Sequence, residues 1–196
     1  AALLRPPSQS DRLSDSQRND AETSWLQNLA SELITIHKQS AGGVLVLMTS
    51  LANVAYVKRQ IADAGLAIIV IVADGQTPIA KQKVQFLNAV AAGLKPLWLA
   101  VGGAWTGLDV GGHGPWQEIF GDALEAQDDN ALTTLVIPRI PFGTNQTITH
   151  QWRKNHRPGV PWELFETAFR FKQGLGRLIR RPGLPQNRDI YVLDGR

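Results

Sequence analysis

Cysteine is absent from all 196 residues of the chain. Its absence excludes disulfides, thiolate zinc sites and thiolate-held iron–sulfur clusters within this chain. No apolar run approaches the roughly 20 residues that a membrane-spanning helix needs. The polar opening AALLRPPSQSDRLSDSQRND also lacks the basic region and apolar core of a signal peptide. We therefore expect a cytoplasmic protein that makes no contact with a membrane.

Several catalytic motifs are also missing. The chain has no GxxxxGK[ST] loop to hold nucleotide phosphates and no GxSxG elbow of a serine hydrolase. Its GLG tripeptide at 174–176 is not a dinucleotide fingerprint, because no strand leads directly into a helix there. The four histidines are scattered without the spacing of paired metal ligands, so we expect no metal site. On its own, the chain should not hydrolyse nucleoside triphosphates.

Charge is unevenly distributed although the net charge is only +3. Acidic residues gather between Glu118 and Asp129, whereas basic residues are frequent in the last third of the chain. Arg153, Lys154, His156 and Arg157 fall within a long basic segment, 143–161. Such a run either binds phosphates or forms a solvated face, and the sequence leaves both readings open.

Hydrophobic periodicity predicts alternating helices and strands. Short apolar runs predict buried strands, and amphipathic stretches that end at glycines predict helices. The predicted strands are 44–48, 66–73, 97–101, 132–137 and 189–193; the predicted helices are 21–39, 51–64, 78–92 and 162–181, with a basic loop at 143–161 and an acidic insertion at 112–130 containing a short helix near 115–126.

This alternation predicts an α/β fold with a parallel sheet covered by helices on both faces. Ligand sites of such folds lie at the carboxyl ends of the strands. The loops after Met48, Val101 and Ile137 are therefore the places where we expect function.

The stretch FKQGLGRLIRRPG places a glutamine and several arginines beside glycines near the end of the last predicted helix. Gln173, Arg177 and Arg180 are spaced by four and three residues, so their side chains project from one helix face. Guanidinium groups arranged in this way can bind several oxygens of one phosphate. The alternative is a basic helix end that interacts with its own dipole and with solvent.

Two further loops offer polar groups at strand ends. GGAWTGLDVGG, from Gly102 to Gly112, combines exposed backbone amides with Thr106 and Asp109, which suits either a phosphate-binding loop or a tight turn around a buried tryptophan. Thr49 and Ser50 open the next helix, where at least one of the two hydroxyls is expected to cap it and the other could bind a backbone phosphate.

Taken in order, four blocks resemble the second motor domain of superfamily 2 helicases of the DinG and XPD type. They are VLVLMTSLANV, GGAWTGLDVGG, LTTLVIPRIPFGTNQT and QGLGRLIRRPGLPQNRDIYVLDGR. The last block is the most specific, because it matches the QxxGRxIR motif of that family. The resemblance covers nearly the whole chain and implies a RecA-like fold, with a polar lead-in segment from the preceding domain at 1–20 and the motor domain at 21–196.

The resemblance also implies specific roles. ATP and Mg²⁺ would lie between two RecA-like domains and be held mainly by the first domain, which is missing from this chain. No iron–sulfur cluster is expected in this chain either. Arg177 and Arg180 match the arginines that stabilise charge on the transferring phosphoryl group, and Gly107, Asp109 and Gln173 match residues of the nucleotide side. Thr49, Ser50, Thr106 and Arg139 would contact single-stranded DNA, along which the motor would move from 5′ to 3′.

Departures from the family pattern refine this expectation. Thr106 stands where relatives carry an acid, GTNQT replaces their proline-rich run, and the acidic insertion is long. These differences favour the CRISPR-associated DinG-like branch, with an RNA-guided complex as a partner. A non-catalytic RecA-like module that binds nucleic acid or protein is the alternative, and a flavodoxin-like or Rossmann-type enzyme is disfavoured by the missing glycine fingerprint.

Overall fold

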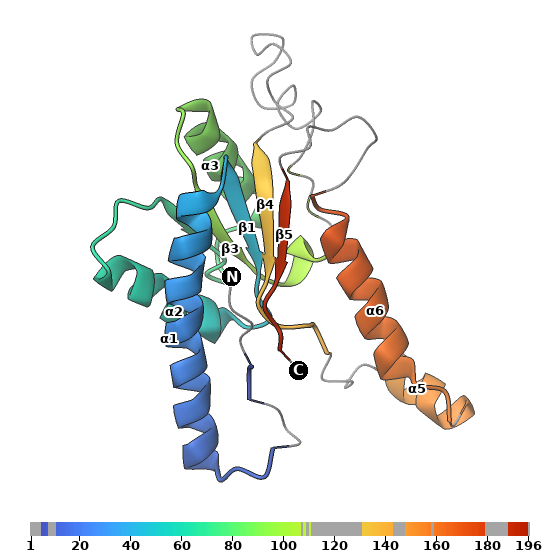
Figure 1. Cartoon of the computed structure of the whole chain (residues 1–196). Coiled ribbons are helices and arrows are strands. Elements are labelled where there is room, and N and C mark those ends of the chain that lie inside the picture. Colours follow the sequence, from blue (N-terminus) through green and yellow to red (C-terminus); the bar gives the residue numbers. More distant parts are fainter. Residues whose placement is uncertain are drawn as a thin grey trace, which may run out of the picture.

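The computed structural model describes residues 5–7, 11–106, 108, 110, 131–142, 148–157, 159–178 and 188–195. Its centre is a five-stranded sheet in which every neighbouring pair of strands is parallel, in the order β2-β3-β1-β4-β5 (Figure 1). The strands are β1 (Gly43–Leu47), β2 (Val70–Val72), β3 (Leu97–Ala100), β4 (Leu132–Ile137) and β5 (Asp189–Val192). The predicted α/β class with a RecA-like parallel sheet is confirmed.

Helices cover both faces of the sheet. Along β1, Leu45 and Leu47 pack on one face and Val44 and Val46 on the other, because successive strand residues point in opposite directions. The helices α1 (Asp15–Gln39) and α2 (Leu51–Asp63) pack against the valines. The opposite face is covered by α3 (Ile79–Ala91) and by α6 (Trp162–Leu175). The apolar run at 44–48 thus predicted correctly a strand that is buried on both faces of the sheet.

Helix α1 begins earlier than predicted, at Asp15 rather than Ala21. Its N-cap is Ser14, whose hydroxyl accepts from the Gln17 backbone N–H while the Gln17 side chain accepts from the Ser14 N–H. This capping box satisfies free backbone donors at the helix start, and it explains why polar residues join the helix. The end of the predicted lead-in is therefore helical, whereas its assignment to a preceding domain stays a prediction.

Helix α6 is shorter than predicted. It ends at Leu175, and residues 176–178 form turns in which Arg177 N–H donates to Gly174 O and Leu178 N–H to Leu175 O. The prediction that the helix continues through these residues was wrong, since two glycines within three positions weaken it at that point. Residues 179–181 lie outside the described residues, as does the predicted insertion at 112–130 with its short helix.

The predicted basic loop 143–161 contains a helix, α5 (Ile148–His156), so the loop prediction was wrong over these residues. The Trp152 and His156 rings stack 4.2 Å apart, centroid to centroid, at the i, i+4 spacing of a helix. Arg153 of this helix forms a 2.9 Å ion pair with Glu166 of α6. The Arg153 contact is between helices and could not be seen from local hydrophobicity, which is low in this segment.

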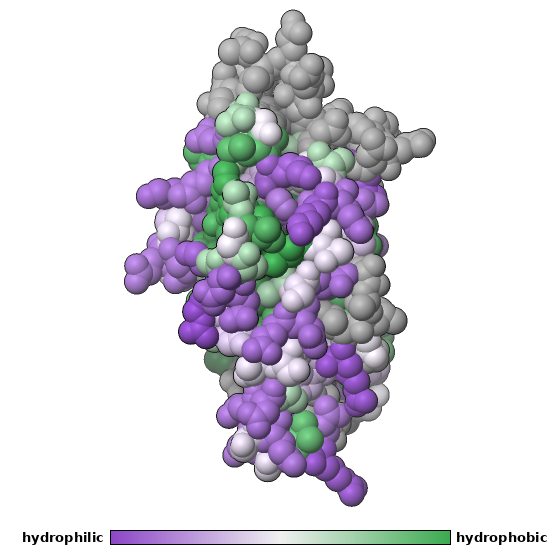
Figure 2. Space-filling view, turned by 60° about the vertical axis from the view of Figure 1, so that its left-hand side comes forward, coloured by the Kyte–Doolittle hydropathy of each residue, from purple (hydrophilic) through white to green (hydrophobic). Residues whose placement is uncertain are grey.

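The edge strand β2 is also shorter than the predicted strand 66–73. Hydrophobic side chains stay exposed around it, and Figure 2 shows hydrophobic residues gathered in the middle of this side of the molecule, between hydrophilic ones. The exposed hydrophobic residues of α2, α3 and the adjoining loops are Leu51, Leu66, Ile69, Val84 and Leu94. Among the described helices, none is long and apolar enough to cross a membrane.

Candidate functional site

The three loops predicted to carry function start at the same edge of the sheet. Strands β3, β1 and β4 are adjacent and parallel, so their carboxyl ends point the same way. Strand β1 leads into Thr49 and Ser50, β3 leads into the short 3₁₀ helix η1 (Gly102–Ala104), and β4 leads into the segment 138–142. Parallel topology therefore brings together segments that are far apart in the sequence.

A pocket of about 450 Å³ opens among these loops and α6. It contains two hydroxyls, from Thr49 and Thr106, one cationic side chain, Arg170, and the half-exposed ring of Phe142. The remaining lining residues are Met48, Gly102, Trp105 and Pro141. A guanidinium and hydroxyls suit a phosphate, and an accessible aromatic ring suits a nucleobase, so the pocket has the chemistry of a nucleotide-unit site.

Two predicted site residues, Thr49 and Thr106, thus line one pocket, although 57 residues separate them in sequence. Ser50 is the N-cap residue of α2 but makes no side-chain capping hydrogen bond, and it is outside the pocket lining. The expectation that one of the two hydroxyls caps this helix was wrong. Arg170 was missed as a site residue, although it lies on α6 three residues before Gln173 and so on the same helix face.

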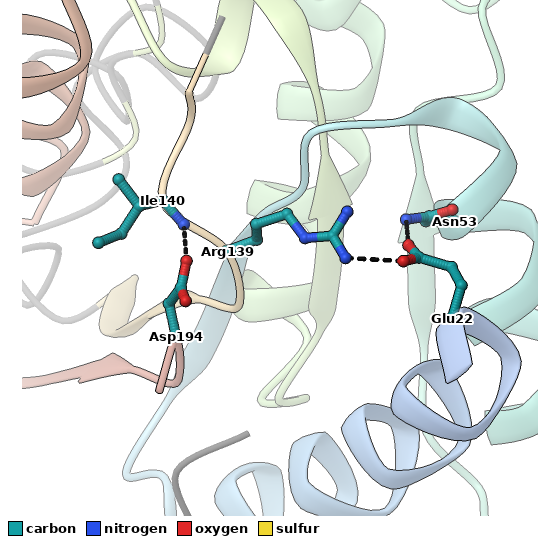
Figure 3. Close-up of polar contacts among 5 residues, drawn as sticks. All are labelled: Glu22, Asn53, Arg139, Ile140 and Asp194. Atoms are coloured by element: carbon teal, nitrogen blue, oxygen red, sulfur yellow. Dashed lines mark hydrogen bonds and ion pairs between the residues drawn. The ribbon is translucent and has the colours of Figure 1, made fainter. Parts of the chain in front are cut away.

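Arg139 lies outside the pocket lining. Figure 3 shows that its guanidinium reaches α1, where it donates to Glu22 Oε2 at 2.7 Å, while Glu22 Oε1 accepts from Asn53 Nδ2 at 2.9 Å. The Arg139 guanidinium carbon also lies 4.4 Å from the Trp25 ring centroid. These partners join α1, α2 and the end of β4, and DNA contact by Arg139 stays a prediction.

The turn after β4 is fixed from the other side by Asp194, which follows β5. Its Oδ2 accepts from the Ile140 backbone N–H at 2.8 Å (Figure 3). Asp194 is buried, and a carboxylate that binds a backbone amide in this way has a structural role.

At the end of α6, Arg177 is only 8% exposed. Its Nε donates to the Gln173 backbone carbonyl at 3.0 Å, and its NH1 donates to the carbonyl of Leu108. Leu108 lies between Gly107 and Asp109, so Arg177 holds the loop that sequence reasoning assigned to the nucleotide. Gly107, Asp109 and Arg180 themselves lie outside the described residues.

Gln173 precedes Arg177 by one helical turn and is half-buried. Within the described part of the chain, its side-chain Oε1 has no hydrogen-bond partner although it is buried. A buried acceptor without a donor is costly, and such groups commonly find a donor in a ligand or another chain. The described residues contain no group of three His, Cys, Asp or Glu side chains that could hold a metal ion.

Known structures share this fold. The structure titled "Structure of S. tokodaii Xpd4" matches 98% of this chain and 33% of its own chain, with 18% identity and a TM-score of 0.58. A structure titled "XPD_Helicase" matches 98% and 30%, with 15% identity and a TM-score of 0.62, and one titled "XPD_APO" matches 97% and 34%, with 20% identity and a TM-score of 0.60. The chain thus spans about a third of the length of each.

No curated protein matches the chain in sequence. A family model does match, and its description is "Helicase C-terminal domain". The match runs over residues 33–196, from within α1 to the end of the chain, and it includes every strand and the whole candidate site. This chain therefore belongs to the helicase C-terminal domain family.

Proposed function

We propose that this chain is the second motor domain of an ATP-dependent DNA helicase that moves from 5′ to 3′ along single-stranded DNA. The observation that carries the proposal is the loop 102–108, which lines the pocket through Trp105 and Thr106 and is bound by Arg177 at Leu108. One short loop thus joins the candidate DNA pocket to the arginine-bearing end of α6.

In this proposal ATP and Mg²⁺ are held mainly by a first motor domain, and ATP hydrolysis supplies the free energy for movement. Arg180 stabilises charge on the transferring phosphoryl group, an effect worth about 10³ to 10⁵ in rate in nucleotide hydrolases. Arg177 is assigned the holding of the loop 102–108, since its guanidinium donates to two backbone carbonyls. Gln173, whose Oε1 has no hydrogen-bond partner among the described residues, is assigned to the nucleotide side. A cytoplasmic location and a CRISPR RNA-guided complex as partner complete the proposal.

DNA-stimulated ATP hydrolysis by the full-length protein tests the motor assignment. Arg180→Ala should lower turnover by at least about 10³ while single-stranded DNA binding is retained. Arg181→Ala is the matched control, because it removes a neighbouring arginine outside the QxxGRxIR pattern. Equal turnover in the parent and the Arg180→Ala protein would contradict the proposal.

The pocket is tested separately by DNA affinity. Arg170→Ala should weaken single-stranded DNA binding and reduce the slope of log K against log salt by about one, because one phosphate contact is lost. Lys172→Ala, an exposed cation on the same helix but outside the pocket lining, is the matched control. An unchanged salt slope for Arg170→Ala would show that Arg170 contacts no DNA phosphate and would contradict DNA binding by this pocket.

A second candidate is a non-catalytic RecA-like module that binds nucleic acid or protein. The burial of Arg177 and its donation to backbone carbonyls favour it, because this arginine already has structural partners. The two candidates differ in one result: a module of this kind would bind DNA without ATP hydrolysis that depends on Arg180.

A further inference from the structure

Trp105 lies where α6, β1 and the loop after β3 meet. Its indole is 5% exposed, and its Nε1 donates to the Met48 carbonyl at 3.0 Å, directly after β1. On its other side is Gly174 of α6, where an added Cβ would lie 3.0 Å from ring atoms Cε3 and Cζ3. The α6 backbone therefore rests on the indole with no side chain between them.

The residues that follow these contacts are the hydroxyl residues of the pocket. Thr49 follows Met48, and Thr106 follows Trp105. Trp105 also lines the pocket itself. A shift of the indole would therefore move both hydroxyls, because each is one peptide unit away from a group that the indole holds.

The turn that follows α6 carries Arg177. Arg177 lies three residues after Gly174 and binds the carbonyl of Leu108, three residues after Trp105. The loop is thus attached to the end of α6 at two points, by ring packing at Trp105 and by a hydrogen bond at Leu108. An indole is a rigid plane, so it transmits displacement of the helix rather than absorbing it.

We propose that Trp105 is a positioning residue that couples the arginine-bearing end of α6 to the DNA pocket. This inference rests on the proposed function and deepens it. When a nucleotide engages the end of α6, the Gly174 backbone moves against the indole, and the Met48 carbonyl follows through the Nε1 hydrogen bond. The affinity of the pocket for single-stranded DNA then changes with the nucleotide state, which is a coupling free energy between two sites.

The test measures the dissociation constant of the full-length protein for single-stranded DNA with and without a non-hydrolysable ATP analogue and Mg²⁺. The ratio of the two constants is the coupling factor, for which about 5-fold or more is typical of coupled sites. Trp105→Phe removes the Nε1 donor to Met48 and also reduces the ring surface against Gly174, so it weakens both contacts of the indole. We expect the coupling factor of this variant to fall to about 2-fold or less, below the range typical of coupled sites.

Trp98→Phe is the matched control. Trp98 is fully buried in the same hydrophobic cluster, and its Nε1 donates to Gln82 Oε1 at 2.9 Å, a hydrogen bond of similar length to a partner away from the pocket. The control should lower the thermal stability by a comparable amount and keep the coupling factor of the parent.

Each outcome has a defined meaning. A parental coupling factor in Trp105→Phe overturns the inference, and so does an equal loss in both tryptophan variants, because that would reflect general destabilisation. If Trp105→Phe does not fold, Gly174→Ala decides the question: its methyl group presses on the indole without removing the hydrogen bond, and an unchanged coupling factor overturns the inference. The proposed function is overturned as well if the DNA affinity of the parent protein does not change with the ATP analogue and DNA does not stimulate its ATP hydrolysis.

Discussion

The two faces of the sheet are built differently. On the α1 and α2 face, hydrophobic side chains fill the core, and polar contacts lie at its two ends. Glu22, Asn53 and Arg139 meet beyond the end of β4, and the buried Thr134 hydroxyl donates to the Ser40 hydroxyl near the start of β4. On the α3 and α6 face, polar groups enter the core itself: Trp105 binds a backbone carbonyl, and Arg177 is buried. The comparison shows that the loops of the candidate site are held from the α6 side and only braced from the α1 side.

A physical reason connects this difference to function. Hydrophobic packing is non-directional, so it stabilises a face without fixing any loop atom by atom. Hydrogen bonds to buried carbonyls fix position, because a lost partner leaves a buried polar group unpaired. The α6 face directs its buried hydrogen bonds at the site loops, and the four predictions below examine each side in turn.

The largest effect is expected from Gly43→Ala, at the start of β1. A Cβ at this position would lie 2.3 Å from Phe86 Cζ and 2.5 Å from the Ala131 carbonyl oxygen, and the backbone oxygen cannot move aside cheaply. We expect a loss of about 3 kcal/mol in the free energy of unfolding, measured by urea denaturation. Gly93→Ala, with φ of +74° and open space around the new methyl group, should lose only about 1 kcal/mol. Equal losses would show that the α3 side can relax.

Arg177→Met should have the next largest effect, about 2 kcal/mol. The substitution keeps an apolar stem but leaves the buried carbonyls of Leu108 and Gln173 without their guanidinium donor. Urea denaturation measures the loss, and proteolysis at the loop 102–110 should become faster than in the parent. A stability equal to that of the parent would mean that other contacts hold the loop.

A smaller loss, about 1 kcal/mol, is expected from Glu22→Ala on the opposite face. The side chains of Glu22 and Arg139 are 27% and 21% exposed, so solvent already weakens their ion pair. A double-mutant cycle with Arg139→Ala gives the coupling energy of the pair from four unfolding curves. Asp20→Ala, an exposed carboxylate on the same helix, should stay within about 0.5 kcal/mol of the parent. If Glu22→Ala lost no more stability than Asp20→Ala, the contact between Glu22 and Arg139 would not stabilise this face.

The smallest effect concerns Asp74, in the loop that leads from β2 to α3. Hydrogen bonds from the Thr77 backbone N–H, the Thr77 hydroxyl and the Gln76 backbone N–H favour the carboxylate and lower the pKa of Asp74 to about 2. Because the folded pKa is below the unfolded value of about 3.9, its stabilisation is present above pH 4 and is lost as the pH falls towards 2.

A carboxyl titration followed by NMR should therefore give a midpoint near pH 2 for Asp74, well below that of an ordinary aspartate. Thr77→Val should move the midpoint upward by removing the hydroxyl donor while leaving both backbone donors in place. An Asp74 midpoint near 4 in the parent protein would show that this turn is open in solution.

Much of the fold was predictable. Apolar runs marked the central strands β1, β3 and β4, because burial on both faces leaves a strong hydrophobic signal, and glycines marked the ends of several helices. The helix Ile148–His156 was not predictable in the same way, since part of its support comes from the Arg153 contact with Glu166 of α6. The extent of α6 was overestimated, because helical spacing of Gln173, Arg177 and Arg180 was given more weight than the glycines between them.

For the candidate site, residue types were predicted better than their partners. Thr49 and Thr106 were both named, and the structure places them in one pocket. Arg139 was named for DNA contact, which stays a prediction; its contact with Glu22 was not foreseen, because α1 approaches it only in the folded chain. Arg170 was missed for a related reason: a basic residue on a helix surface looks solvated until a pocket forms beside it.

The sequence by itself determined the α/β class, the parallel order of segments and the identity of the glutamine and arginine block, because periodicity and spacing are local properties of the chain. Only the tertiary structure decided that Arg177 is buried against Leu108, that Gly174 rests on Trp105, and that Arg170 joins the threonines. These contacts join residues that are distant in sequence, and their geometry is set by the packing of α6 on the sheet, which no local pattern encodes.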